Sequence, residues 1–303
     1  MLAKYKYIVQ IKKRMKNLFL LLVALLLASV SIAKENCLDQ ICQTEKSEDA
    51  INPWCGCYCF NFFNGTRTAR ILPKGKFTLS LKFQDFDFDE KEYSQGKYKD
   101  IGSGQRKYRE KYILTSRYGW AEGHHFAVSV PYIRNDFNFG KVKNNSEDIG
   151  NIALIEKFEI FKETNTRPAV SFDFSYFLPT GDSNRKVGTD NESYRMTFSV
   201  SKAWKDFSLH LNPSYRWNKD QGRSEESRIN AAILLTPGKT FKPALEYNYR
   251  YLEGSGHSQD IVPGVLWNFC KGMTMQVGIP INLDSTFKHR DEVGLIMKIC
   301  KTF

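Results

Sequence analysis

The sequence has no long apolar run beyond residue 33, and its mean hydropathy is −0.44. A transmembrane helix needs about 20 consecutive apolar residues. The absence therefore excludes a helical membrane protein. It does not exclude a membrane β-barrel, because only alternate residues of a barrel strand face lipid and the hydropathy of each segment stays low.

Motifs of enzymes and cofactor sites are also missing. No predicted helix follows Gly102-Ser103-Gly104, so this stretch is not a phosphate loop. The absence of C-x-x-C-H excludes an ordinary c-type haem attachment site. We interpret Gly254-Ser255-Gly256-His257-Ser258 as a loop with a solvated histidine, and His124-His125 as surface residues. We expect no catalytic residues, no metal and no cofactor.

The N-terminus carries charge of one sign only. Residues 1–17 contain six Lys and Arg and no acid, and an unbroken apolar run covers residues 18–28. Ser31 and Ala33 are small residues at the positions that a signal peptidase reads. This pattern predicts a secretory signal peptide over residues 1–33, starting at Met1 or Met15. Subtracting its six positive charges from the net +11 leaves +5, which is too mild to indicate a nucleic-acid partner.

Residues 34–74 are predicted to form a periplasmic, cysteine-rich segment. In an oxidising periplasm the default state of cysteines is the disulfide. A thiolate metal site is the alternative, but C-x-C-x-C lacks the two-residue spacing of zinc knuckles and no histidine lies nearby. All seven cysteines are disulfide candidates, and an odd number leaves one thiol unpaired within the chain: Cys37, Cys42, Cys55, Cys57, Cys59, Cys270 and Cys300.

Residues 75–303 contain twelve segments in which apolar and polar residues alternate. In one of them, Tyr, Met, Phe and Val at positions 194, 196, 198 and 200 alternate with Arg195, Thr197 and Ser199. A period of two is that of a β-strand. An even number of segments of about ten residues predicts an all-β fold, a twelve-stranded antiparallel transmembrane β-barrel. A soluble secreted β-sandwich remains an alternative.

The last thirteen residues alternate in the same way and end on Phe303. This resembles the terminal strand of bacterial outer-membrane barrels, where the aromatic end is the assembly signal. We therefore expect an outer-membrane protein of a Gram-negative cell, with membrane lipid and the barrel assembly machinery as partners. Short predicted connections such as 162–168 alternate with longer polar ones such as 87–109, 135–148 and 282–290, which places both termini in the periplasm.

The polar faces of the segments predict what lies in the lumen. Seven charged residues are expected to point inward along the solute pathway: Lys82, Arg117, Asp173, Arg195, Arg216, Glu246 and Arg250. Pairing of the arginines with the two acids would fill the interior, whereas an excess of positive charge would favour anionic solutes. Aromatic residues near the segment ends, among them Tyr118, Tyr176, Trp204, Trp217 and Trp267, predict interfacial girdles.

Two short elements carry a family resemblance. Asn151-Ile152-Ala153-Leu154 precedes a strand that ends in Phe177-Leu178-Pro179-Thr180-Gly181-Asp182. This pattern resembles the meta-pathway phenol-degradation family of outer-membrane β-barrel transporters, over roughly residues 75–303. The resemblance implies uptake of aromatic or other hydrophobic compounds. The Leu-Pro-Thr-Gly-Asp stretch itself has the composition of a strand terminator and turn.

Together these patterns predict a channel or transporter for small solutes of aromatic or anionic character. Two alternatives stay open. One is an outer-membrane lipid hydrolase, and the other is a structural or surface barrel that transports nothing.

Overall fold

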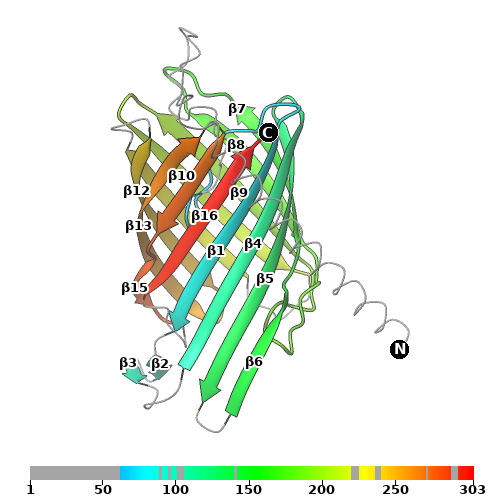
Figure 1. The fold of residues 1–303 in the computed structure, drawn as a ribbon, viewed down its shortest axis with the longest axis vertical. Helices are drawn as coiled ribbons and strands as arrows, with labels where there is room; N and C mark the ends of the chain where they lie inside the picture. The colour runs from blue at the N-terminus through cyan, green and yellow to red at the C-terminus, as the bar shows by residue number, and fades with distance from the viewer. Residues whose placement is uncertain are drawn as a thin grey trace, which may run out of the picture.

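The computed structural model is a closed antiparallel β-barrel (Figure 1). It describes residues 62–88, 91–94, 97–100, 106–139, 142–219, 225–235, 240–270, 272–287 and 293–303. The predicted signal peptide (1–33) and the cysteines at 37, 42, 55, 57 and 59 lie outside these residues. In the described part of the chain, no helix is long and apolar enough to cross a membrane.

The described residues build twelve wall strands, as the alternating segments predicted. Ten are continuous: β1 (Phe77–Phe88), β4 (Arg106–Ala121), β5 (His124–Phe139), β8 (Ala169–Phe177), β9 (Ser193–Ala203), β10 (Phe207–Asn218), β11 (Glu226–Leu235), β12 (Phe241–Leu252), β13 (Gly256–Cys270) and β16 (Val293–Thr302). Each of the other two consists of two pieces: β6 (Val142–Ile149) with β7 (Ala153–Phe161), and β14 (Met273–Gly278) with β15 (Ile281–Ser285). The barrel closes where β1 pairs with β16, with Leu81 opposite Ile299.

The interruptions have local causes. Between β14 and β15 stands Pro280, which has no N–H to give to the ladder. Between β6 and β7 the side chain of Thr180 replaces the missing ladder bonds. Its hydroxyl donates to Gly150 O (2.7 Å) and accepts the N–H of Ile152 (3.0 Å). Thr180, which belongs to the predicted strand terminator after β8, thus also satisfies backbone groups at the interruption between β6 and β7.

The two faces of the wall differ in the way that a lipid environment requires. In β9 the polar Thr197, Ser199 and Ser201 are almost fully buried, whereas Met196 and Phe198 are 41% and 49% exposed. A wall that is apolar outside and polar inside is the inverse of a soluble core and is typical of membrane barrels. Closure gives the wall strands a partner on both sides over most of their length, so their backbone hydrogen bonds are satisfied within the wall, whereas β6 pairs with β5 alone.

Aromatic side chains mark both rims. We call the rim where β1 begins and β16 ends the C-terminal rim, and the other the loop rim. Exposed aromatic residues at the C-terminal rim include Phe77, Tyr118, Trp120, Trp204, Phe241, Trp267 and Phe303. Near the loop rim, Tyr176, Tyr194 and Trp217 form a stacked row with ring centroids 5.1 and 5.6 Å apart. These belts fit the interfacial girdles that the sequence predicted.

The strands are longer than predicted, and two expected loops are partly wrong. Residues 135–148 are mostly β5 and β6, with Asn135 opposite Ser146, and β15 extends into 282–290 as far as Ser285. β4 and β5 each have 16 residues. Alternation of apolar and polar residues stops where both faces of a hairpin become polar, although backbone pairing continues. β2 (Lys91–Ser94) and β3 (Lys97–Asp100) form a separate hairpin within the connection predicted as 87–109.

Candidate functional site: a basic lumen with an inserted segment

The chain before β1 enters the barrel. We call Phe62–Leu72 the luminal segment, because wall strands on all sides contact it. Its partners come from β1, β5, β7, β9, β10 and β12: Lys82, His125, Lys157, Ser201, Asn212 and Glu246. Because these partners lie around the whole wall, the segment fills part of the lumen.

Glu246 holds the turn of the luminal segment. Its carboxylate accepts the backbone N–H groups of Asn64 (2.8 Å), Gly65 (2.7 Å) and Thr66 (2.6 Å), and the hydroxyl of Thr66 (3.0 Å). Glu246 is completely buried. Several charge-assisted hydrogen bonds are what a carboxylate needs when it is removed from water. The wall therefore fixes this turn with one side chain.

Further wall side chains take up the backbone groups of the segment. Asn212 accepts the N–H of Arg67 (2.6 Å) and donates to its carbonyl (2.9 Å). The N–H of Ala69 donates to Ser201 Oγ (2.7 Å), and that of Leu72 to His125 Nδ1 (3.1 Å). The prediction that both His124 and His125 are surface residues is wrong for His125, which is 3% exposed.

Phe63 anchors the segment to the wall. The side chain is fully buried, and its ring lies over Gly264 of β13 and Gly278 of β14. A Cβ at Gly278 would meet the ring at 2.7 Å, and a Cβ at Gly264 would meet it at 2.5 Å. The two glycines therefore form a socket that admits the ring only because both positions lack a side chain.

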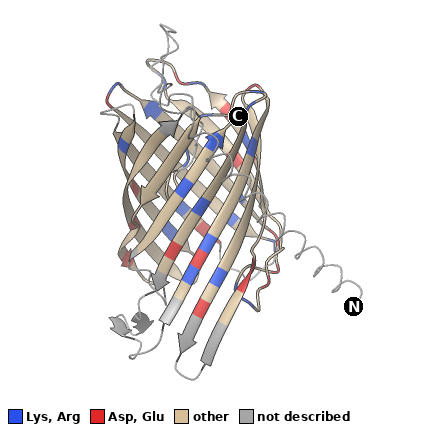
Figure 2. Cartoon of the chain, in the orientation of Figure 1, with Lys and Arg blue, Asp and Glu red and all other residues tan. Residues whose placement is uncertain are grey.

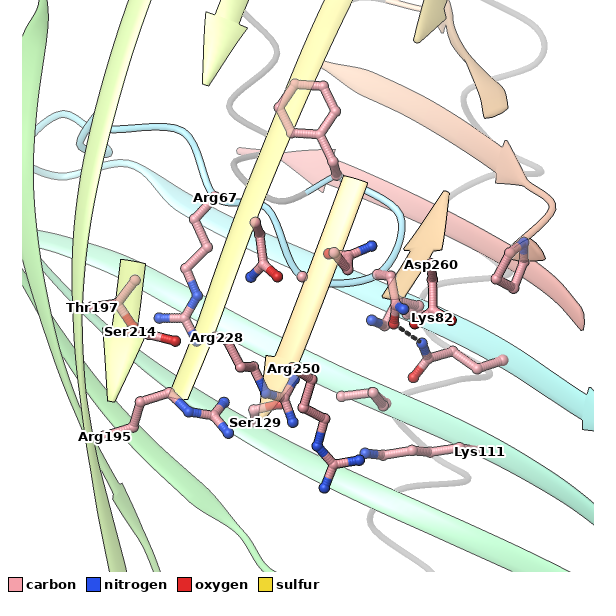
Figure 3. Close-up of a pocket in the computed structure, with 18 of the residues that line it drawn as sticks. Arg67, Lys82, Lys111, Ser129, Arg195, Thr197, Ser214, Arg228, Arg250 and Asp260 are labelled. Carbon is pink, nitrogen blue, oxygen red and sulfur yellow. Dashed lines mark hydrogen bonds between the residues drawn. The ribbon is translucent and has the colours of Figure 1, made fainter. Parts of the chain in front are cut away.

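Beside the luminal segment lies a cavity of about 480 Å³ that is strongly basic (Figure 3). Among the described residues, ten cationic side chains and one acid, Asp260, line it. The cations are Arg67, Lys82, Arg109, Lys111, Arg117, Arg195, Arg216, Arg228, Arg250 and Lys298. Basic residues recur along the length of the wall strands (Figure 2).

Glu226 organises one side of this cavity. Its carboxylate lies 2.7 Å from Arg195 Nη2, 2.7 Å from Arg228 Nε and 2.8 Å from Arg250 Nε. One carboxylate is thus shared among three guanidinium groups. Arg195 and Arg216 also lie over the ring of Phe177, 5.3 and 4.3 Å from its centroid. These contacts hold the arginines in place without neutralising them.

The structure places all seven predicted lumen residues on the inner face. Five of them line the cavity: Lys82, Arg117, Arg195, Arg216 and Arg250. Asp173 and Glu246 do not pair with these five, contrary to one expectation. Asp173 lies 3.4 Å from Arg67 of the luminal segment and 3.7 Å from Lys157, and Glu246 binds backbone N–H groups instead.

Sequence reasoning missed Lys111, Glu226 and Arg228. The alternation of faces along a strand could have found them. Each lies next to an apolar or aromatic residue that points outward, or two positions from a residue that points inward. The sharing of Glu226 among strands β9, β11 and β12 was not predictable, because it depends on the register between strands.

The glycine- and serine-rich stretch at 254–258 is an exposed turn only at residues 254 and 255, whereas residues 256–258 belong to a strand and not to the expected loop. Gly254 (φ 69°) and Gly256 (φ 112°) form a tight turn, and β13 begins at Gly256. His257 Nε2 lies 2.9 Å from Asp284 Oδ2. Ser258 lines the inner cavity, whereas His257 lies opposite the outward-facing Tyr251, so the two side chains do not form a catalytic pair.

Comparisons with known proteins agree with this architecture. A family model described as "Putative MetA-pathway of phenol degradation" matches residues 108–290, more than half of the chain. No curated protein matches the sequence.

Among solved structures, an outer membrane channel from Pseudomonas putida F1 is 12% identical, with a TM-score of 0.63. The match covers 78% of this chain and 98% of that one. The toluene transporter TbuX of Ralstonia pickettii is 9% identical, with a TM-score of 0.44 and coverages of 78% and 91%. The KdgM porin is 11% identical, with a TM-score of 0.46 and coverages of 75% and 99%. The first of these likenesses establishes the outer-membrane barrel fold.

Proposed function

The chain belongs to the MetA-pathway phenol-degradation family, and we propose that it forms an outer-membrane channel through which small anionic solutes pass. The observation that carries this proposal is the lining of the cavity, where ten cationic side chains face one acid among the described residues. Rings of basic side chains select anions in a pore because they stabilise an anion that has lost part of its hydration shell.

The size of the barrel supports small solutes. Twelve strands lie between eight-stranded barrels, which side chains fill, and the open porins of sixteen strands. The luminal segment narrows the passage further. The route that we propose runs from the loop rim through the basic cavity and past the luminal segment to the C-terminal rim.

The orientation in the membrane follows from the same proposal. We place the C-terminal rim and both termini in the periplasm, after removal of a signal peptide over residues 1–33. The exposed aromatic belts would then lie at the two lipid interfaces, and Phe303 would be presented to the assembly machinery. Heat-modifiable mobility on a gel, and labelling of cysteines introduced at either rim of whole cells, test this placement.

The test of transport is the reversal potential of the purified full-length protein in a planar bilayer under a KCl gradient. We expect anion selectivity, which should decrease in a Lys298→Gln, Arg117→Gln double variant. Lys219→Gln is the matched control, because Lys219 is 62% exposed and lies outside the cavity. Cation selectivity would refute the proposal. A folded barrel that neither conducts nor supports liposome swelling would indicate a structural role instead.

A further inference from the structure

We propose that the loop-rim half of the cavity contains a binding site for an aromatic carboxylate, formed by Lys111, Arg228 and Arg250 with the rings of Phe86 and Phe287. The inference rests on the proposed function and specifies its substrate class. It is argued from a cation without a counter-ion among the described residues, and from apolar side chains that lie close to it in the lumen.

Lys111 supplies the uncompensated charge. Among the described residues it has no hydrogen bond or ion pair. It lies within electrostatic reach of four other cations: Lys82, Arg109, Arg195 and Arg228. Where such a group is removed from water, a bound anion would stabilise its positive charge. Figure 3 shows the Lys111 side chain pointing toward that of Arg250 across the cavity.

Arg228 and Arg250 supply the preorganised charge. Both donate to Glu226 through Nε, at 2.7 and 2.8 Å. The same carboxylate also binds Arg195, so it cannot neutralise all three. The Arg250 side chain remains 42% exposed and lines the cavity. A carboxylate placed between Lys111 and this cluster would receive hydrogen bonds from both sides.

Apolar surface lies beside these cations. Gln84 pairs with Lys111 and Phe86 pairs with Arg109, so Phe86 and Lys111 are diagonal neighbours on the inner faces of β1 and β4. Phe86 and Pro280 both border Gly294, and all three line the cavity. On the Arg250 side, the guanidinium carbon lies 5.2 Å from the centroid of the Phe287 ring. Each half of the site thus combines a cation with an aromatic ring.

This combination favours an organic anion over an inorganic one. Chloride or phosphate would leave Phe86, Pro280 and Phe287 facing water and would gain nothing from them. A benzoate-like ligand places its carboxylate between the cations and its ring against the apolar surface. Sites for small molecules are typically of this kind, mostly apolar with a few convergent polar groups that fix orientation.

The experiment measures binding of benzoate and of acetate to the folded full-length protein in detergent by calorimetry. This readout does not require conduction. We expect benzoate to bind about tenfold more tightly than acetate, which corresponds to about 1.4 kcal/mol. Lys111→Gln should weaken benzoate binding about tenfold, while Lys111→Arg retains most of it. Phe287→Ala should weaken benzoate binding without changing that of acetate.

Lys219→Gln is the control, and heat-modifiable mobility verifies that each variant is folded. Equal affinities for benzoate and acetate, or unchanged benzoate binding in folded Lys111→Gln, would overturn the aromatic carboxylate site. Anion selectivity in the KCl gradient would survive that result, because nine other cations line the cavity among the described residues. Benzoate binding without anion-selective conductance would instead refute the proposed channel and keep the site.

Discussion

The carboxylate of Glu246 on β12 accepts the backbone N–H of Thr66 at 2.6 Å, although the two residues are 180 positions apart. The segment before the first strand is therefore held from inside the barrel by the ninth wall strand. Among the described residues Glu246 has no cationic partner within 4 Å, and its charge is balanced mainly by N–H dipoles.

Glu246→Gln should loosen the luminal segment. The variant keeps the shape of the side chain but removes its charge, and a hydrogen bond to a charged group contributes about 1.5–3 kcal/mol. We expect a lower unfolding temperature and a higher mean conductance in bilayers. Glu192→Gln is the control, since Glu192 is partly exposed, lies just before β9 and contacts Lys219 (3.1 Å). If Glu246→Gln and Glu192→Gln conduct alike, the segment does not limit the passage.

The socket of Phe63 gives a second prediction. Gly278→Ala should displace the ring, because a new Cβ would lie 2.7 Å from it and 2.9 Å from Val262 Cγ1. Overpacking of this kind costs roughly 1–3 kcal/mol. Phe63→Ala should relieve part of the cost, so the double variant should be more stable than the sum of the two single changes predicts. Additive effects in thermal unfolding would show that Phe63 and Gly278 are not coupled.

A charged substitution on the outer face of the wall should destabilise the barrel more than the same substitution on the inner face. Phe198 is 49% exposed on the outside of β9, whereas the neighbouring Thr197 lines the basic cavity. Arginine on the lipid face near the middle of the membrane costs roughly 2–4 kcal/mol. Phe198→Arg should therefore lower folding yield and stability in urea titrations of lipid-inserted protein far more than Thr197→Arg. A similar loss from both variants would contradict the assignment of faces.

Phe303 should matter for assembly more than for the finished barrel. Its backbone pairs with that of Phe77 in both directions (2.8 and 3.4 Å), and the two rings lie 5.9 Å apart. Deleting Phe303 should reduce the amount of heat-modifiable protein in the outer membrane, and Phe303→Tyr should restore most of it. Unchanged yield after the deletion would argue against a role as the assembly signal.

The disulfide pairing of the cysteines remains a prediction. Cys300 is 1% exposed and faces inward near the C-terminal rim, and Cys270 ends β13 at the same rim. We expect one of them to be linked to a cysteine before residue 60, which would tether the segment and stabilise the protein by about 2–4 kcal/mol. Mass spectrometry of non-reduced peptides tests the link, and reduction should raise conductance. Both thiols free in protein from its native membrane would exclude the tether.

The sequence alone determined the barrel, the inner and outer faces, and the inward position of Arg195, Arg216 and Arg250. These are local properties. A strand between lipid and lumen must alternate, so parity read along a few residues assigns each side chain to a face. The same reasoning placed Asp173 and Glu246 inside.

Only the tertiary structure decided which inward groups meet. Glu226 binds guanidinium groups from β9, β11 and β12, and Glu246 accepts the backbone N–H groups of residues 64–66. Thr180 forms a hydrogen bond to the backbone between β6 and β7. Each contact depends on strand register and on the path of the luminal segment, which join residues far apart in the chain. The alternation of apolar and polar residues predicts neither the register nor the path of the segment, because it gives the face on which a side chain lies and not its neighbours across the lumen.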